Sequence, residues 1–250
     1  MTNTQPTELR QAGFVWAAAA IGAGCAAVTV YWCAAMPVMS SMSVKSPMWP
    51  MAPVGGGLFA FLSTWTVMMV AMMMPVLVPM LRRYRLAVAQ VRPEGIGRRT
   101  AVVGLAYFAV WTAAGVVAFA IGTGVDLAQH HAPAIADHSQ TIGGLVVVAA
   151  GALQFSRWKA HHLACCRSNP TGSSAVWHGV RIGLHCCAAS VGLMAILLVL
   201  GVMNLAVMAL VTAATAIERL APVGRRVAYG IGVIALAAGT GLIVAGVMAG

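Results

Sequence analysis

Two histidines and two cysteines lie within the short segment "RWKAHHLACCR", which starts at position 157. His161 and Cys165 are four positions apart, and so are His162 and Cys166. Residues at this spacing share one face of a helix, so each histidine can join its cysteine in one site. Imidazole and thiolate ligands suit soft or borderline ions such as copper and zinc. The segment therefore predicts a metal site, and the alternative is a basic loop whose histidines and cysteines meet only lipid headgroups and water.

Three basic residues, Arg157, Lys159 and Arg167, surround the two thiols of this segment. A nearby positive charge lowers the pKa of a thiol and favours the thiolate that binds metal. We therefore expect lowered pKa values for Cys165 and Cys166. Basic loops of membrane proteins face the reducing cytoplasm, so metal chemistry is favoured here over structural disulfides.

A second cluster lies in "HGVRIGLHCC", positions 178–187. We expect His185 and Cys186 about one turn inside a long apolar run. Ionisable residues within a membrane span are costly and tend to mark function, so both are candidate metal ligands. The alternative for His185 is a hydrogen bond to a carbonyl at the membrane interface. For Cys187, packing as a small apolar residue is favoured.

Methionines are concentrated in "WTVMMVAMMMPVLVPM", positions 65–80. Met69, Met72 and Met73 share a helical face by their spacing of three and four residues. Thioether sulfur is a soft ligand that selects Cu(I), so Met72 and Met73 are candidate ligands. Methionine also fills gaps between packed helices, and the pattern taken alone favours that role.

Two further groups of soft or borderline ligands lie in segments that the charge pattern places outside the cell. Met36, Met39 and Met42 repeat every three residues and could capture Cu(I), although a surface helix dipping its methionines into lipid is an equal alternative. Asp126 and His130 are four positions apart, and a carboxylate with imidazoles suits Cu(II) or zinc. A histidine-containing external loop without function is the alternative for this pair.

The composition of the chain identifies the environment of these clusters. Of 250 residues, 60% are hydrophobic and only 8% are charged, with a mean hydropathy of +0.87. A soluble domain carries about 25% charged residues, so most of this surface must face lipid. The apolar runs are unbroken over about 20 residues, the length of a membrane-spanning helix, whereas strands of a membrane barrel alternate polar and apolar residues. We expect an all-α, polytopic transmembrane helical bundle that forms one integral membrane domain, residues 1–250.

The apolar runs predict about seven spans, with five or six as the alternative. The segment 182–217 is too long for one upright helix and is interrupted by "LGVMN", positions 200–204, where a turn would make a hairpin. The other expected spans cover residues 13–36, 57–81, 101–125, 141–157 and 227–248.

The basic residues set the expected orientation. With a hairpin in 182–217, every lysine and arginine except Lys45 falls on one side of the membrane. The positive-inside rule then places the N-terminus in the cytoplasm and the protein in the inner (plasma) membrane. The net charge of +10 is explained by these short clusters, so the partner is the lipid bilayer and not nucleic acid.

Several of these motifs together resemble a family of bacterial predicted metal-binding integral membrane proteins of unknown function, some members of which are described as copper chaperones. The resemblance rests on "WTVMMVAMMMP", "QFSRWKAHHLACCR" and the stretch from His178 to Leu220. The family's middle motif reads Lys-x-x-Cys-Leu-x-x-Cys-Arg. In this chain Lys159 and Cys166 match it, while His162 stands where the first cysteine would be. The resemblance thus implies a site at His162 and Cys166 with an altered metal preference.

The last motif departs further from the family pattern, Cys-x-Gly-Cys-Cys-Trp ahead of Leu-Met. Cys186 matches the first cysteine, whereas Ala189 and Ser190 occupy the positions of the cysteine pair. His185 is an additional potential ligand, so the resemblance implies a histidine-enriched variant. The matches "GVMNL" and "ERL" draw attention to Asn204 and Glu218, and we expect Glu218 to pair with a nearby arginine or a ligand histidine.

We interpret the chain as a metal-binding membrane protein that captures or delivers copper, or assists the assembly of a copper enzyme. The metal is expected to be copper, with zinc or iron less favoured, and the partners would be a protein that supplies or receives it or a membrane complex. Two alternatives stay open: a subunit of a membrane-bound metalloenzyme, such as a copper oxidase or monooxygenase, and a metal transporter. The sequence does not decide whether the chain is itself an enzyme.

Overall fold

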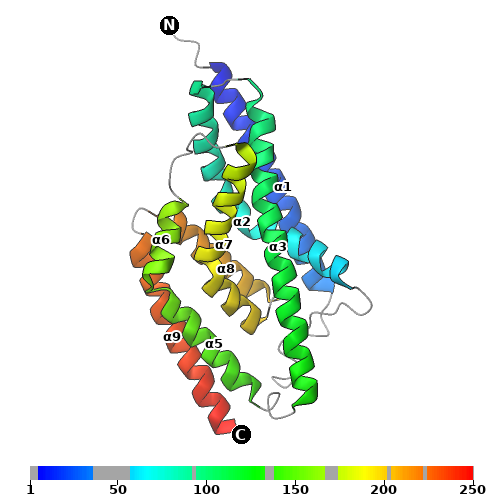
Figure 1. The fold of residues 1–250 in the computed structure, drawn as a ribbon, viewed down its shortest axis with the longest axis vertical. Helices are drawn as coiled ribbons and strands as arrows, with labels where there is room; N and C mark the ends of the chain where they lie inside the picture. The colour runs from blue at the N-terminus through cyan, green and yellow to red at the C-terminus, as the bar shows by residue number, and fades with distance from the viewer. Residues whose placement is uncertain are drawn as a thin grey trace.

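The computed structural model describes residues 5–35, 57–91, 94–132, 138–166, 174–201, 204–221 and 224–249. Within these ranges all regular secondary structure is helical, in eight helices, and the long helices α2 and α3 run roughly along the long axis of the molecule (Figure 1). The expected all-α fold is therefore confirmed. The helices are α1 (Gln5–Ala35), α2 (Leu58–Val91), α3 (Ile96–His131), α5 (Ser139–Leu153), α6 (Arg157–Cys165), α7 (Ala175–Leu200), α8 (Leu205–Leu220) and α9 (Gly224–Ala249).

Five of the described helices, α1, α2, α3, α7 and α9, are long and apolar enough to cross a membrane, and α5 with α6 raises the number to six. Many large apolar side chains on these helices face outward, including Phe59 (91% exposed) and Ile234 (70% exposed), as a lipid-facing surface requires. The chain is thus a multi-pass membrane protein whose five or six spans match the lower of the predicted counts. Helix α8 adds a shorter seventh element.

The break predicted within residues 182–217 is present. Helix α7 ends at Leu200, Gly201 takes a left-handed φ of 104°, and α8 begins at Leu205. Asn204 caps α8, because its side-chain oxygen accepts hydrogen bonds from the backbone N–H groups of Ala206 (3.0 Å) and Val207 (3.2 Å). With 16 residues, α8 is about 24 Å long, shorter than the roughly 30 Å hydrocarbon core.

The single straight span expected at residues 141–157 is wrong, because the helix bends before residue 157. Helix α5 ends at Leu153, and α6 starts at Arg157 at an angle of 63° to it. The cause is local: the Ser156 side chain caps α6 by accepting a hydrogen bond from the Lys159 N–H (3.1 Å), which starts a new helix in place of continuing the old one. The bend swings the histidines and cysteines of α6 towards α7.

Close helix contacts at glycines assemble the bundle. Helix α3 packs along α7, and α5 packs along α9 (Figure 1). A Cβ placed on Gly179 of α7 would lie 2.5 Å from the Val103 carbonyl oxygen of α3, and one on Gly239 of α9 would lie 2.8 Å from the Val148 nitrogen of α5. Small residues permit such approaches between membrane helices, so backbone contact fixes the position of α7 against α3.

Candidate metal centre

Three histidines from α6 and α7 gather at one place on the surface of the bundle. The Nδ1 atoms of His162 and His185 lie 2.8 Å apart, and their ring centroids are separated by 5.1 Å. The His161 ring lies 5.4 Å from the ring of His162 and 6.4 Å from that of His185. Two imidazole nitrogens on one tetrahedral metal ion are about 3.3 Å apart, given metal–nitrogen bonds of about 2.0–2.1 Å. A small rotation of either ring would therefore let His162 and His185 hold one ion.

Cys165 extends this histidine group along α6. Its Sγ lies 3.6 Å from Nε2 of His161, so these two side chains share a helix face as their spacing predicts. Both are accessible enough to meet a metal ion arriving from solvent. His161 and Cys165 thus form a second donor pair beside His162 and His185.

The spacing of His162 and Cys166 also predicted a shared site, but the structure gives them different partners. His162 contacts His185, whereas Cys166 lies in the core, where the Nη1 of Arg219 donates to its Sγ (3.3 Å). Cys166 is the C-cap residue of α6, and α6 ends at Cys165. Cys166 nevertheless keeps helical φ and ψ angles, and its N–H donates to the His162 carbonyl oxygen (3.1 Å). The two residues therefore keep their helical spacing, and only the contacts of their side chains differ.

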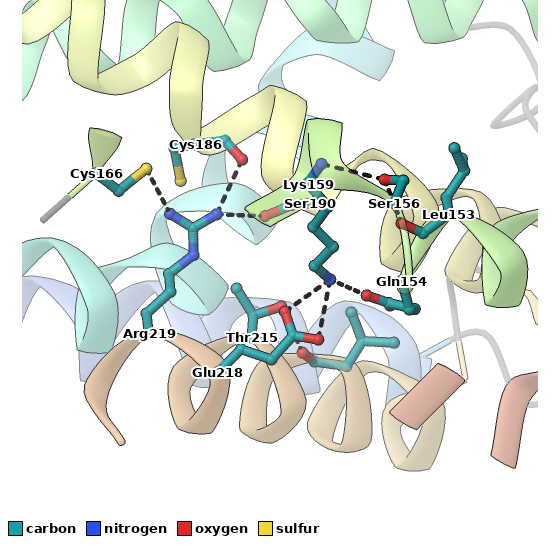
Figure 2. Close-up of polar contacts among 11 residues, drawn as sticks. Leu153, Gln154, Ser156, Lys159, Cys166, Cys186, Ser190, Thr215, Glu218 and Arg219 are labelled. Atoms are coloured by element: carbon teal, nitrogen blue, oxygen red, sulfur yellow. Dashed lines mark hydrogen bonds and ion pairs between the residues drawn. The ribbon is translucent and has the colours of Figure 1, made fainter. Parts of the chain in front are cut away.

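Arg219 of α8 links Cys166 to α7. Its Nη2 donates hydrogen bonds to the Cys186 carbonyl oxygen (3.0 Å) and to Oγ of Ser190 (2.8 Å). Figure 2 shows the side chains of Cys166 and Cys186 on the same side of the guanidinium group. On α3, the Tyr107 hydroxyl lies 2.8 Å from Cys186 Sγ. A buried group of two cysteines, an arginine, a serine and a tyrosine thus lies next to the partly exposed histidines.

The expectation that basic neighbours lower the pKa of the Cys166 thiol is wrong. Burial raises its pKa to about 11; Arg219 opposes that rise, and negative charge on Cys186 adds to it. Lys159 does not act on this thiol, since its ammonium group is turned to Glu218. The thiol is therefore protonated at neutral pH, and a metal ion must displace its proton to bind.

Lys159 and Glu218 form a buried ion pair that sequence analysis did not foresee. The Lys159 Nζ lies 2.9 Å and 2.8 Å from the two carboxylate oxygens of Glu218, and it also donates to Oε1 of Gln154 (Figure 2). Both residues are nearly inaccessible, at 4% and 2% exposed. The sequence predicts that Glu218 pairs with an arginine or a histidine; its ion-pair partner is Lys159, and Arg219 also interacts with it electrostatically. The pair joins the start of α6 to the end of α8. It therefore fixes the position of α6, the helix that carries His161 and His162.

The other predicted ligands lie apart from the α6–α7 group. Met72 and Met73 are buried in α2, in the same apolar core as Cys186, where they pack as gap-filling side chains. Asp126 and His130 are exposed on the last turns of α3, with 3.9 Å between Oδ1 and Nε2, away from α6 (Figure 1). The methionine array at positions 36–51 lies outside the described residues.

The donors near α6 and α7 are imidazoles and thiols, which suit soft or borderline ions such as copper and zinc. Among the described residues, the structure contains no group of three or more histidine, cysteine or acidic side chains arranged to hold one ion. The imidazoles of His162 and His185 contact each other, and in the core Arg219 donates to Cys166 Sγ and to the Cys186 carbonyl oxygen.

The comparison with protein families agrees with this donor chemistry. A family model described as PpoB2, copper chaperone, matches residues 62–242. The chain belongs to this family. The match covers nearly all of α2 and most of α9 with every helix between them, so it includes all the histidines and cysteines of the α6–α7 site. No curated protein and no solved structure matches the chain.

Proposed function

We propose that this PpoB2-family protein is an inner-membrane copper chaperone that binds copper at the α6–α7 histidines and passes it to a partner protein, such as a copper enzyme under assembly. The observation that carries the proposal is the pair of imidazole nitrogens of His162 and His185, only 2.8 Å apart on two different helices. The family's description as copper chaperones supports copper as the cargo.

The partial exposure of this pair favours transfer over permanent storage. Two imidazoles leave coordination positions of the metal open. A side chain of the partner protein can bind the metal there before the histidines dissociate from it. The metal then moves by ligand exchange without ever being released as a free ion. A closed four-ligand structural site would not permit this step.

The basic residues support a cytoplasmic position for the pair. Arg157 and Arg181 lie on α6 and α7 within one to two turns of His162 and His185, and the positive-inside rule assigns such clusters to the cytoplasm. The N-terminus would lie on the same side. Copper would accordingly be taken up from, or handed to, a protein at the inner membrane face.

Removing both imidazoles tests the proposal. The double variant His162→Ala, His185→Ala, purified anaerobically in mild detergent, should bind Cu(I) about 100-fold more weakly than the wild type, or worse. This estimate is conservative, because loss of a residue that merely orients a ligand already costs about 10- to 100-fold in metal affinity. Competition with a chromogenic Cu(I) chelator gives the affinity, and elemental analysis gives the metal content.

The double variant Asp126→Ala, His130→Ala is the matched control, because it removes a donor pair of exposed residues at another place. It should bind copper as the wild type does. Copper retained by the α6–α7 variant and lost by this control would move the site to the end of α3. A wild-type protein that binds no copper would overturn the proposed function.

A further inference from the structure

The outer face of α6 carries a histidine and a cysteine whose donor atoms already lie at the spacing of a metal chelate. Nε2 of His161 lies 3.6 Å from Sγ of Cys165. A tetrahedral ion with a metal–nitrogen bond of about 2.0–2.1 Å and a metal–sulfur bond of about 2.3 Å holds these two atoms about 3.6 Å apart. The nitrogens of His162 and His185, at 2.8 Å, must first move apart to share an ion, whereas the outer pair needs no such movement.

The position of this pair follows from the way α6 packs. Lys159 and Leu163 are buried, at 4% and 6% exposed, and they mark the face of α6 that packs on the bundle. Residues two positions further along a helix lie about 200° around its axis, so His161 and Cys165 lie on the opposite face. His161 is exposed and Cys165 is partly exposed. A metal ion or a partner protein can therefore reach both donors.

The inner histidine–cysteine pair of α6 has the same spacing but not the same geometry. Cys166 is buried, and its sulfur accepts a hydrogen bond from Nη1 of Arg219 (3.3 Å). The ring of His162 contacts His185 of α7 instead. A spacing of four residues on a helix permits a shared site but does not ensure one. Of these two pairs, the structure brings together the donor atoms of the outer one.

We propose that His161 and Cys165 form a second copper site, with one nitrogen and one sulfur ligand, beside the site of His162 and His185. Binding replaces the proton of the thiol: one Cu(I) ion gains a bond to sulfur and a bond to the neutral imidazole, one proton passes to water, and the copper stays Cu(I). Thiolate sulfur favours Cu(I), and imidazole also suits copper. This inference rests on the proposed copper function and adds a second site to it.

The two sites are close but separate. The His161 ring lies 5.4 Å from that of His162 and 6.4 Å from that of His185. Within the described ranges no three histidine, cysteine or acidic side chains are arranged around one ion, so each pair holds its own. The outer pair is more exposed to water and to competing ligands, and we therefore expect it to bind copper more weakly than the inner site. An ion on the outer pair would meet a partner protein first.

Cu(I) titration of the full chain, purified anaerobically in mild detergent, tests the second site. The wild type should bind two ions, and the X-ray absorption spectrum of the bound copper should show sulfur as well as nitrogen neighbours. The double variant His161→Ala, Cys165→Ser should bind one ion, through nitrogen alone. The double variant His162→Ala, His185→Ala should keep only the weaker, sulfur-containing site.

Alkylation of Cys165 gives a second readout that does not depend on the number of bound ions. Bound copper should protect this thiol from a maleimide, as measured by mass spectrometry of the digested protein. In His161→Ala the same protection should require about 10- to 100-fold more copper, the range known for loss of a group that supports a metal ligand. Equal protection in this variant and in the wild type would contradict a shared site.

The double variant Cys25→Ser, Cys33→Ser is the matched control, because it removes two partly exposed cysteines of α1. It should keep both ions and the sulfur signal. A sulfur signal that survives Cys165→Ser and is lost in Cys166→Ser would overturn the inference, and so would a single ion that is lost in either double variant of the α6–α7 donors. Copper bound by nitrogen alone in the wild type would overturn it and leave the proposed function intact. A wild-type protein that binds no copper would overturn both.

Discussion

Replacing Glu218 by alanine is expected to lower the free energy of unfolding by about 3–5 kcal/mol. The substitution leaves the ammonium group of Lys159 buried without its carboxylate partner, and this is the usual cost of breaking a buried ion pair from one side. Both residues are almost fully inaccessible, so water cannot replace the lost partner. Denaturant unfolding in detergent micelles, followed by tryptophan fluorescence, measures the change.

The double variant Lys159→Met, Glu218→Leu separates the charge effect from the loss of packing. It removes both charges at similar volume and should recover most of the lost stability, since apolar replacements of buried ion pairs are often neutral or stabilising. Glu94→Ala is the matched control for removing an acid, because Glu94 is exposed. A Glu218→Ala protein as stable as the wild type would contradict the buried pair.

The pair is also expected to matter for copper. It joins α6, which carries His162 and Cys166, to α8, which carries Arg219. Breaking it frees α6 to move against α7, so Glu218→Ala should weaken Cu(I) binding as well as stability. The double apolar variant should restore both together, because the pair holds the site and does not itself bind metal.

Replacing Gly179 by alanine is expected to destabilise the protein by about 1–3 kcal/mol, the typical cost of overpacking a core. The new Cβ would lie 2.5 Å from the Val103 carbonyl oxygen and 2.7 Å from the Ala106 Cβ. A carbonyl within a helix cannot move aside without disturbing its own hydrogen bond, so α7 must shift away from α3. Thermal unfolding monitored by circular dichroism measures the loss.

The shift should reach the candidate site. Cys186 lies two turns after Gly179 on α7, and its contact with Tyr107 crosses the same α3–α7 interface. We therefore expect weaker Cu(I) binding by Gly179→Ala. Gly104→Ala is the matched control on α3: nothing lies within 4 Å of its added Cβ, and alanine favours the helix by about 1 kcal/mol. Equal stability of both variants would contradict the close packing at Gly179.

Much of the fold follows from local properties of the chain. Unbroken apolar runs of membrane-spanning length predict the long helices whatever their neighbours are, because each helix satisfies its own backbone hydrogen bonds in lipid. The break between α7 and α8 is also local, since Gly201 and the Asn204 cap lie within it. The bend after α5 was not predicted, because Ser156 lies at the end of an apolar run and its role as a cap is not evident from that run.

The candidate site could be predicted in composition but only partly in pairing. The histidines and cysteines of α6 and α7 were identified from their types and spacing, and the structure gathers them where these helices meet. Spacing along one helix predicted His162 with Cys166, yet the ring nitrogen of His162 contacts that of His185, 23 residues away. A helix rule describes one face of one helix, whereas contacts between helices depend on how those faces are turned towards each other.

The sequence by itself determined that this is a multi-pass helical membrane protein with soft metal donors near its basic side, because hydrophobic length and residue chemistry are properties of the chain. Only the tertiary structure decided which charges and donors meet. Lys159 meets Glu218 across 59 residues, and Arg219 meets Cys166 across 53. The physical reason is burial: in a core without water each polar group must find its partner on whichever helix packs against it, and the packing of α6, α7 and α8 supplies those partners.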